Sequence, residues 1–149
     1  MKLLKWLSVC DRFTKVYLDS RLSPLGINSS QHMYLLKICD RPGIAQDDLI
    51  DSVYVHPSNV VRSIAALEKN GFVTKGPHDT DRRTCRLYPT PKALEVAEQV
   101  RRICDEAEAL LTDALSPEER EAFAQALLCA GQKAAQAAGV TRKGDDFDA

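Results

Sequence analysis

One stretch of this chain combines helical periodicity with clear start and stop signals. Between Pro57 and Gly71, the apolar residues Val60, Ile64 and Leu67 recur at spacings of four and three residues. That spacing stacks their side chains on one face of a helix. Proline suits a first helical position because its missing N–H is not needed there, and glycine favours the left-handed conformation that ends many helices. The pattern therefore predicts an amphipathic helix from Pro57 to just before Gly71.

The opposite face of this helix carries side chains suited to contact with DNA bases. It holds Asn59, Arg62, Ser63 and Ala66. Arginine pairs bidentately with guanine and asparagine with adenine, while small residues let a helix sit deep in the major groove. An ordinary solvated face is the alternative reading, and this face alone does not decide between them. The segments on either side favour DNA recognition.

A short helix is predicted immediately before this one. Leu49, Ile50 and Val53 would form its buried side. Asp47 and Asp48 fall in its first turn, where acidic groups favour the positive end of the helix dipole. Together the two segments predict a pair of helices joined by a tight turn.

After Gly71 the pattern changes from helical to extended. Residues 72–75 are rich in strand formers, Gly76-Pro77 marks a turn, and residues 84–88 alternate between apolar and polar. Between the two strands lies a charged tip with Asp81, Arg82 and Arg83. A narrow DNA minor groove attracts an inserted arginine, and Asp81 would orient one guanidinium. A solvated hairpin is the alternative, but the position directly after a helix pair favours minor-groove contact by Arg82 or Arg83.

The fold class predicted is mainly α with a small β-hairpin. A winged helix-turn-helix unit over residues 28–89 would be flanked by long dimerisation helices at residues 3–22 and 90–139. Residues 1–139 would form one unit, and the polar segment 140–149 a disordered tail. Helix starts are indicated by a capping-box pattern at Asn28–Gln31, by Thr90-Pro91 and by a second capping box at Ser116. The long helix after Thr90 is expected to bury this stripe: Leu94, Ala97, Cys104, Ala107 and Leu111.

The charge distribution agrees with a localised DNA-binding surface. The net charge is −1, which alone argues against a nucleic-acid partner. Residues 56–92, however, hold seven Lys or Arg against three Asp or Glu, whereas residues 93–149 hold six against twelve. The local field matters more than the total charge for groove binding. The basic region coincides with the predicted helix pair and hairpin.

Other functional classes find little support in the sequence. Five cysteines and three histidines are scattered without ligand spacing, so no metal, cofactor or disulfide framework is predicted. No nucleophile–base pairing or phosphate loop is present, so we do not expect an enzyme. The chain has no apolar run long enough to span a membrane and no cleavage-like site, which predicts a cytoplasmic protein without a membrane partner.

These motifs resemble the MarR (multiple antibiotic resistance regulator) family. The resemblance rests on Ser58, Val60, Arg62, the run Leu67-Glu68-x-x-Gly71-Phe72-Val73, and Asp81-x-Arg83 followed by Thr90. It implies a homodimer that binds a pseudo-palindrome in double-stranded DNA and usually represses transcription. By the same resemblance, the residues that face the major groove would be Ser58, Asn59, Arg62 and Ser63. Three positions depart from the family pattern, namely Ala45 at a helix cap, His56 at the start of the second helix, and Ala93 after Thr90.

The resemblance also implies a site for regulation. Family effectors bind between the dimerisation helices and the DNA-binding lobe, which makes Tyr17, Arg21, His32 and Met33 candidates for a small-molecule pocket. Plain core packing is the alternative for Tyr17 and Met33. Two other functions stay open: a thiol-based redox sensor of the same fold, suggested by Cys10, and a winged-helix protein-interaction module without DNA binding.

Overall fold

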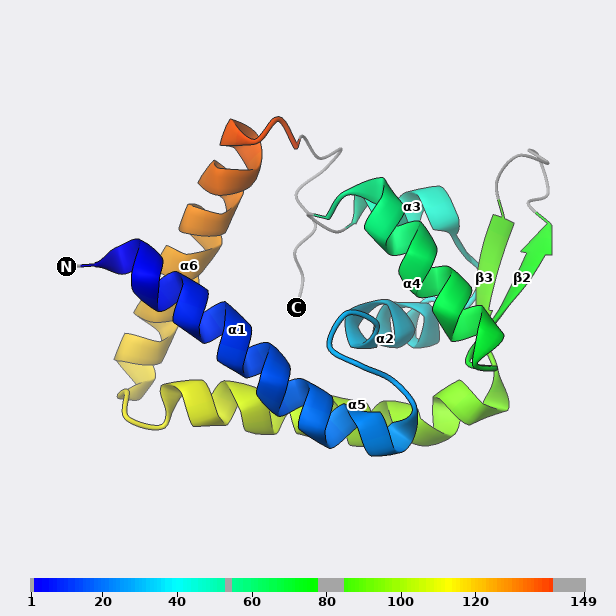
Figure 1. The fold of residues 1–149 in the computed structure, drawn as a ribbon, viewed down its shortest axis with the longest axis horizontal. Helices are drawn as coiled ribbons and strands as arrows, with labels where there is room; N and C mark the ends of the chain where they lie inside the picture. Colours follow the sequence, from blue (N-terminus) through cyan, green and yellow to red (C-terminus); the bar gives the residue numbers. More distant parts are fainter. Residues whose placement is uncertain (1, 53–54, 78–84, 141–149) are drawn as a thin grey trace.

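The computed structural model describes residues 2–52, 55–77 and 85–140 (Figure 1). Within these ranges the helices are α1 (Leu3–Leu22), the short 3-10 helix η1 (Ser23–Leu25), α2 (His32–Asp40), α3 (Gln46–Asp51), α4 (Pro57–Lys69), α5 (Pro91–Thr112) and α6 (Pro117–Ala137). The strands are β1 (Ile44–Ala45), β2 (Val73–Pro77) and β3 (Cys85–Pro89). The predicted fold class is confirmed, because the protein is mainly helical with a small antiparallel sheet.

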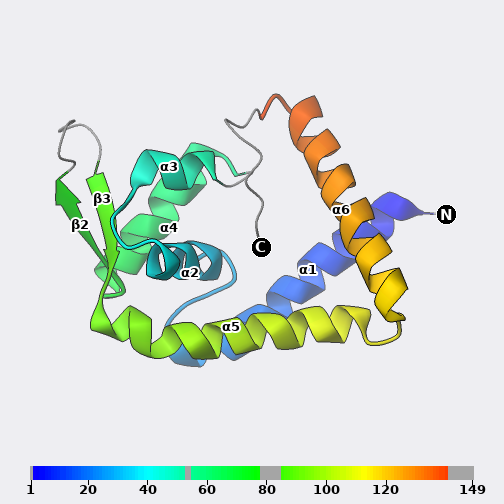
Figure 2. The same cartoon turned by 180° about the vertical axis from the view of Figure 1, so that it is seen from behind.

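The elements form a compact lobe and a set of long helices that extend from it. The lobe contains α2, α3, α4 and the sheet, while α5 runs along one side of the molecule (Figures 1 and 2). α5 contacts α1, α2 and β3, so it joins the lobe to the extended part. α6 follows α5 after a sharp turn at the end of α5 that lies far from the sheet (Figure 1).

One hydrophobic core holds the lobe against α1 and α5. Its members come from every part of the lobe and from both long helices, and their burial is the main stabilising contribution to the fold. The largest fully buried side chains are Phe72, Leu22, Leu35, Ile38, Leu49, Ile64, Leu67, Leu87, Val60, Val73 and Val100. The predicted stripe of α4, with Val60, Ile64 and Leu67, therefore lies in this core.

The C-terminus of α4 ends as the sequence predicts. Gly71 has φ +80°, its N–H donates to the carbonyl oxygen of Glu68 at 3.0 Å, and the Phe72 N–H donates to that of Leu67 at 2.9 Å. This is a Schellman motif, and the buried side chains of Leu67 and Phe72 supply its usual hydrophobic contact. The Thr90 hydroxyl then donates to the Gly71 carbonyl oxygen at 2.6 Å, which ties the end of α4 to the start of α5.

The sheet differs from the predicted two-stranded hairpin in two ways. β1 pairs with β3 through Ile44↔Leu87 and Ala45↔Arg86, which gives the strand order β1-β3-β2. Two residues are too few to show the apolar–polar alternation of a strand, so the sequence could not reveal β1. The prediction of a turn at Gly76-Pro77 was also wrong, because both residues continue β2 and pair with Arg86 and Cys85. β2 is an edge strand, where proline is tolerated because an outward-facing position needs no N–H donor.

Two helix predictions need correction. The Asn28 N–H donates to the Gln31 side-chain oxygen at 3.2 Å, as a capping box requires, but the Asn28 side chain accepts from the Ser30 N–H at 3.0 Å, and α2 begins only at His32. On α5 the buried face is Ala93, Ala97, Val100, Ile103 and Ala107, while Leu94 and Leu111 are exposed. Alanine is buried there in place of leucine because α5 packs closely against α1 and α2, and small side chains permit that approach.

The start of α6 gives a direct stability prediction. The Ser116 hydroxyl accepts from the Glu119 N–H at 3.3 Å, and the Ser116 N–H donates to the Glu119 carboxylate at 2.8 Å. Ser116→Ala should lower the free energy of unfolding by about 1 kcal/mol, measured by urea denaturation at fixed protein concentration. Ser116→Thr keeps the hydroxyl acceptor and should stay within a few tenths of wild type. Equal losses in both variants would contradict the capping role.

Candidate nucleic-acid interface

α4 presents a polar face to solvent because its other face is held in the core. Ser58, Asn59 and Arg62 are exposed, whereas Ser63 is half-buried. The helix begins at Pro57 directly after its N-cap, His56, and ends at the glycine turn described above. The exposed residues therefore lie along one side of a helix fixed at both ends, as a recognition helix requires.

The long cation on this face is held by its neighbours on the helix. One Arg62 guanidinium nitrogen donates to the Asn59 side-chain oxygen at 2.7 Å, and Nε lies 3.4 Å from the Ser58 carbonyl oxygen. Residues three and four apart are neighbours on a helix, so the contact follows from their spacing. The pair keeps the guanidinium extended along the exposed face, where its remaining N–H groups are free of the protein core.

Ser63 is placed differently from the other predicted contact residues. Its hydroxyl donates to the Ser30 carbonyl oxygen at 3.2 Å, which links α4 to the segment before α2. Its half-buried side chain thus has a structural partner in this chain. A contact between Ser63 and DNA stays a prediction.

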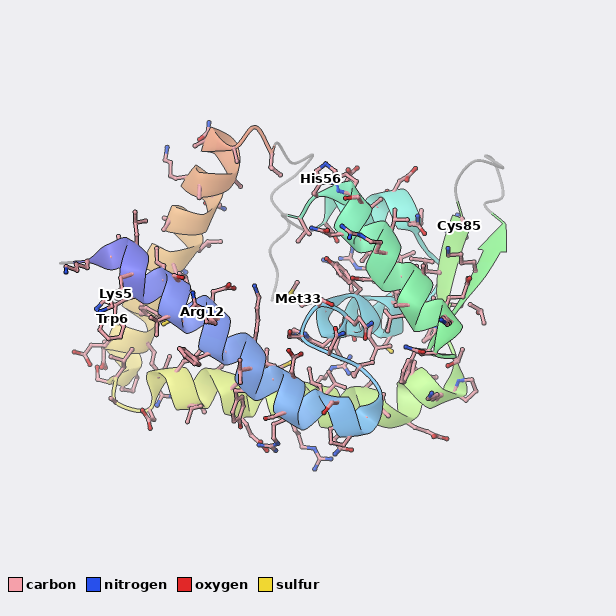
Figure 3. All side chains as sticks on the ribbon, in the orientation of Figure 1. Lys5, Trp6, Arg12, Met33, His56 and Cys85 are labelled. Atoms are coloured by element: carbon pink, nitrogen blue, oxygen red, sulfur yellow. The ribbon has the colours of Figure 1, made fainter. Side chains whose placement is uncertain are left out.

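His56 has a structural role that the sequence analysis did not identify. Its Nδ1 accepts from the Ser58 N–H at 3.2 Å and lies 2.7 Å from the Ser58 hydroxyl. Histidine is an unusual N-cap, so the usual set of Ser, Thr, Asp and Asn did not point to it. The side chain is exposed at the start of α4 (Figure 3). The lone pair of Nδ1 thus takes the place of the oxygen acceptor that a Ser, Thr, Asp or Asn cap would offer.

The predicted residues of the hairpin tip, Asp81, Arg82 and Arg83, lie outside the described residues. The two strands that carry them, β2 and β3, are described and lie next to α4 in the lobe (Figure 1). The minor-groove role of these arginines stays a prediction.

A groove of about 510 Å³ adjoins the exposed face of α4. It runs between Lys15 of α1, the segment before α2, and α4, where Asn59 and Arg62 form part of its wall. Of the four residues predicted for an effector pocket, Met33 lines this groove, and its side chain is exposed (Figure 3).

The other three candidate pocket residues have partners within the protein. The Tyr17 hydroxyl accepts from Arg21 at 2.9 Å, and Arg21 forms an ion pair with Glu106 of α5 at 2.5 Å. His32 Nδ1 lies 2.9 Å from the Ser29 carbonyl oxygen, and burial lowers the pKa of His32. Tyr17 and Arg21 thus connect α1 to α5, and the neutral form of His32 is favoured at pH 7.

The cysteines are separated in the fold. Cys10 and Cys129 are exposed, and Cys39, Cys85 and Cys104 are half-buried. Burial raises the pKa of the Cys39 and Cys104 thiols, which favours the less reactive thiol form. Among the residues that the structure describes, no cluster of His, Cys, Asp or Glu could hold a metal ion.

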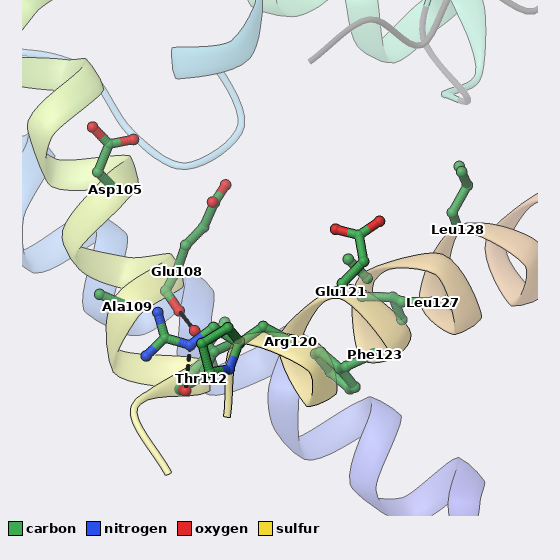
Figure 4. A pocket seen from close by; sticks show the side chains of 12 residues that line it. Asp105, Glu108, Ala109, Thr112, Arg120, Glu121, Phe123, Leu127 and Leu128 are labelled. Atoms are coloured by element: carbon green, nitrogen blue, oxygen red, sulfur yellow. Dashed lines mark hydrogen bonds between the residues drawn. The ribbon is translucent and has the colours of Figure 1, made fainter. Parts of the chain in front are cut away.

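Large apolar side chains are exposed on the helices that extend from the lobe. On α1 they include Trp6, which is 58% exposed, and Phe13 (Figure 3 shows Trp6). None of the α6 residues is buried in this chain, although Phe123 and Leu127 are strongly apolar. These two residues line a groove of about 670 Å³ between α5 and α6 (Figure 4). No helix among the described residues has the length and apolarity to cross a membrane.

Comparison with known proteins agrees with this arrangement. The model of the MarR family matches residues 27–85, which run from the segment before α2 to the first residue of β3. The HTH-type transcriptional regulator YybA of Bacillus subtilis is 29% identical over 103 residues, 69% of each chain.

Solved structures share the fold over nearly the whole length. A MarR protein from Peptoclostridium difficile superposes with a TM-score of 0.85 at 24% identity, over 91% of this chain and 89% of that one. The MepR–DNA complex of S. aureus superposes with a TM-score of 0.82 at 20% identity, over 89% of this chain and 98% of that one. Residues 27–85 therefore match the MarR family, and the chain has the winged helix-turn-helix fold of solved MarR proteins.

Proposed function

We propose that the protein is a sequence-specific transcriptional regulator that binds double-stranded DNA as a homodimer and represses the genes beside its operator. The observation that carries the proposal is the exposed face of α4, where Arg62 is held by Asn59 on a helix with a buried opposite side. The recognition helix would enter the major groove, and Arg82 or Arg83 would enter the minor groove. MepR, which has the same fold, is known bound to DNA.

The exposed apolar helices support the dimer. A monomer in water rarely leaves a tryptophan, a phenylalanine and several leucines exposed on neighbouring helices, and such patches mark interfaces. A two-fold dimer buries the same patch on both chains and is the commonest solution. Two copies of α4 would then read two half-sites separated by one or more DNA turns, which explains why a pseudo-palindrome is expected.

The groove beside α4 supports regulation by a small molecule. Its wall includes Asn59 and Arg62, the same residues that would contact bases. A ligand seated against these side chains would compete with DNA for them. Met33 would contribute an adaptable apolar surface to such a site.

The alternatives have less support in the geometry. For a thiol-based sensor, burial raises the pKa of Cys39 and Cys104 and favours their less reactive thiol form, so the exposed Cys10 stays the candidate. For a protein-interaction module, the exposed face of α4 should be apolar, yet Ser58, Asn59 and Arg62 dominate it. We therefore favour a DNA-binding regulator over both alternatives, and we propose that it acts in the cytoplasm.

A binding titration tests the proposal. The wild-type protein is first used to select duplexes from a random-sequence library, and the selected duplex is titrated by fluorescence anisotropy at two salt concentrations. We expect affinity roughly a thousandfold or more above that for a scrambled duplex. The logarithm of the association constant should fall linearly with the logarithm of the salt concentration.

The same sample should scatter light as a dimer at micromolar concentration. Enrichment of no sequence would overturn the regulator proposal. A monomer that still selects a sequence would overturn the homodimer alone.

A further inference from the structure

The turn between α2 and β1 is fastened to the middle strand of the sheet at one residue. The Gly43 N–H donates to the Leu87 carbonyl oxygen at 2.8 Å. The Gly43 carbonyl oxygen accepts from a guanidinium nitrogen of Arg86, also at 2.8 Å. Both backbone groups of Gly43 are therefore bound to consecutive residues of β3.

The ring of Tyr88 makes a third contact with this turn. A Cβ at Gly43 would lie 3.3 Å from Tyr88 Cε1, and a Cβ at Gly76 would lie 3.1 Å from Cε2 on the other side of the ring. β3 lies between β1 and β2, so Gly76 on β2 and Gly43 beside β1 lie on opposite sides of Tyr88. An aromatic ring can cover a glycine on a neighbouring strand, and here one ring covers two.

Arg86 and Tyr88 reach the turn from the face of β3 that points away from the core. Side chains alternate along a strand, and Leu87 between them is fully buried. The backbone pairing of β1 with β3 covers only Ile44 and Ala45. Side-chain contacts on the outer face therefore add to the core packing of Leu87 in holding the β2–β3 hairpin against this turn.

The turn between α2 and β1 is also connected to α5. Asp40, at the C-terminus of α2, forms an ion pair with Arg101 of α5, and α2 packs along α5. A continuous set of contacts thus runs from α5 through the end of α2 and Gly43 to the outer face of β3. This path reaches the hairpin without passing through α4.

The geometry points to Arg86 and Tyr88 as positioning residues that set the orientation of the β2–β3 hairpin against the turn at Gly43. With this orientation, Arg82 and Arg83 would contact DNA at the same time as α4. The inference rests on the proposed function, because it assigns Arg86 and Tyr88 a role in DNA binding without contact to DNA. A positioning residue can add to DNA affinity no more than the DNA contacts that it positions, which here are those of Arg82 and Arg83. The effect of losing the ring should therefore vanish when the hairpin arginines are absent.

A double-mutant cycle tests this dependence. Tyr88→Ala is made in the wild-type background, in the background Arg82→Ala with Arg83→Ala, and in the background Arg62→Ala. Affinity for the selected duplex is measured by fluorescence anisotropy, and thermal melting is recorded for every variant. Tyr88→Phe keeps the ring and serves as the matched control.

We expect Tyr88→Ala to weaken binding roughly three- to tenfold in the wild-type and Arg62→Ala backgrounds, and to change it less than twofold without the two hairpin arginines. Tyr88→Phe should bind like wild type. If Tyr88→Ala does not fold, Tyr88→Leu takes its place, since leucine stays apolar but cannot cover both glycines.

An equal loss in all three backgrounds would mean general destabilisation and overturn the inference, as would no loss in the wild-type background. If the wild-type protein selects no sequence, the regulator proposal fails and this inference fails with it. Normal selection with additive effects overturns the positioning role alone.

Discussion

Phe72→Ala is expected to lower the free energy of unfolding by about 3–5 kcal/mol. The Phe72 ring is fully buried, and it contributes to the core from the junction between α4 and β2. A Cβ at Gly26 would lie 3.5 Å from the ring, and the Lys92 ammonium lies 4.3 Å from its centroid. Truncation leaves a cavity and also removes the hydrophobic contact of the Schellman motif that ends α4.

Chemical denaturation followed by circular dichroism measures this effect. The variants must be compared at the same protein concentration, because the proposed dimer would make the apparent stability depend on concentration. Phe72→Leu retains most of the buried volume and should lose clearly less than Phe72→Ala. A loss below about 1 kcal/mol for Phe72→Ala would show that this junction does not depend on the ring.

Arg62→Ala is expected to weaken binding to the selected duplex by about 1–3 kcal/mol and to reduce discrimination against a scrambled duplex. The reason is that Arg62 is held in place by Asn59 before DNA arrives, so little side-chain freedom remains to be lost on binding. Fluorescence anisotropy with both duplexes gives the change in affinity and in specificity from one set of samples.

Lys69→Ala is the matched control for Arg62→Ala. Lys69 is also an exposed cation of α4, but it lies at the last residue of the helix. Its removal should cost little and should affect both duplexes alike. If Arg62→Ala lowers the affinity for the two duplexes equally, Arg62 contacts phosphate and does not read bases.

The parts of the fold that the sequence predicted correctly are those with a local physical cause. α4 follows from Val60, Ile64 and Leu67 at helical spacing, and its end follows from Gly71, which takes the positive φ that glycine favours. α5 and α6 start where Thr90 and Ser116 offer a hydroxyl acceptor in front of a proline. These signals need only a few neighbouring residues, so they can be read from one sequence.

The errors arose where distant residues decide the local structure. β1 exists because Ile44 and Ala45 meet β3, some forty residues later in the chain. The buried face of α5 contains Ala93 in place of Leu94 because other helices approach it closely. On the candidate interface, the sequence identified Asn59 and Arg62 as neighbours on an exposed face. It could not show the Ser63 bond to Ser30 or the capping role of His56, because those depend on side-chain geometry.

α5 links the lobe that contains α4 to the rest of the protein as one uninterrupted helix. It has proline only at its first position and no glycine, so the usual causes of a bend are missing from its interior. A hinge within α5 is therefore disfavoured. In the proposed dimer, we expect a change in the separation of the two copies of α4 to come from shear, in which α1 and α2 slide by small steps across α5. Regulation would then change how α1 and α2 pack against α5, and α5 itself would stay straight.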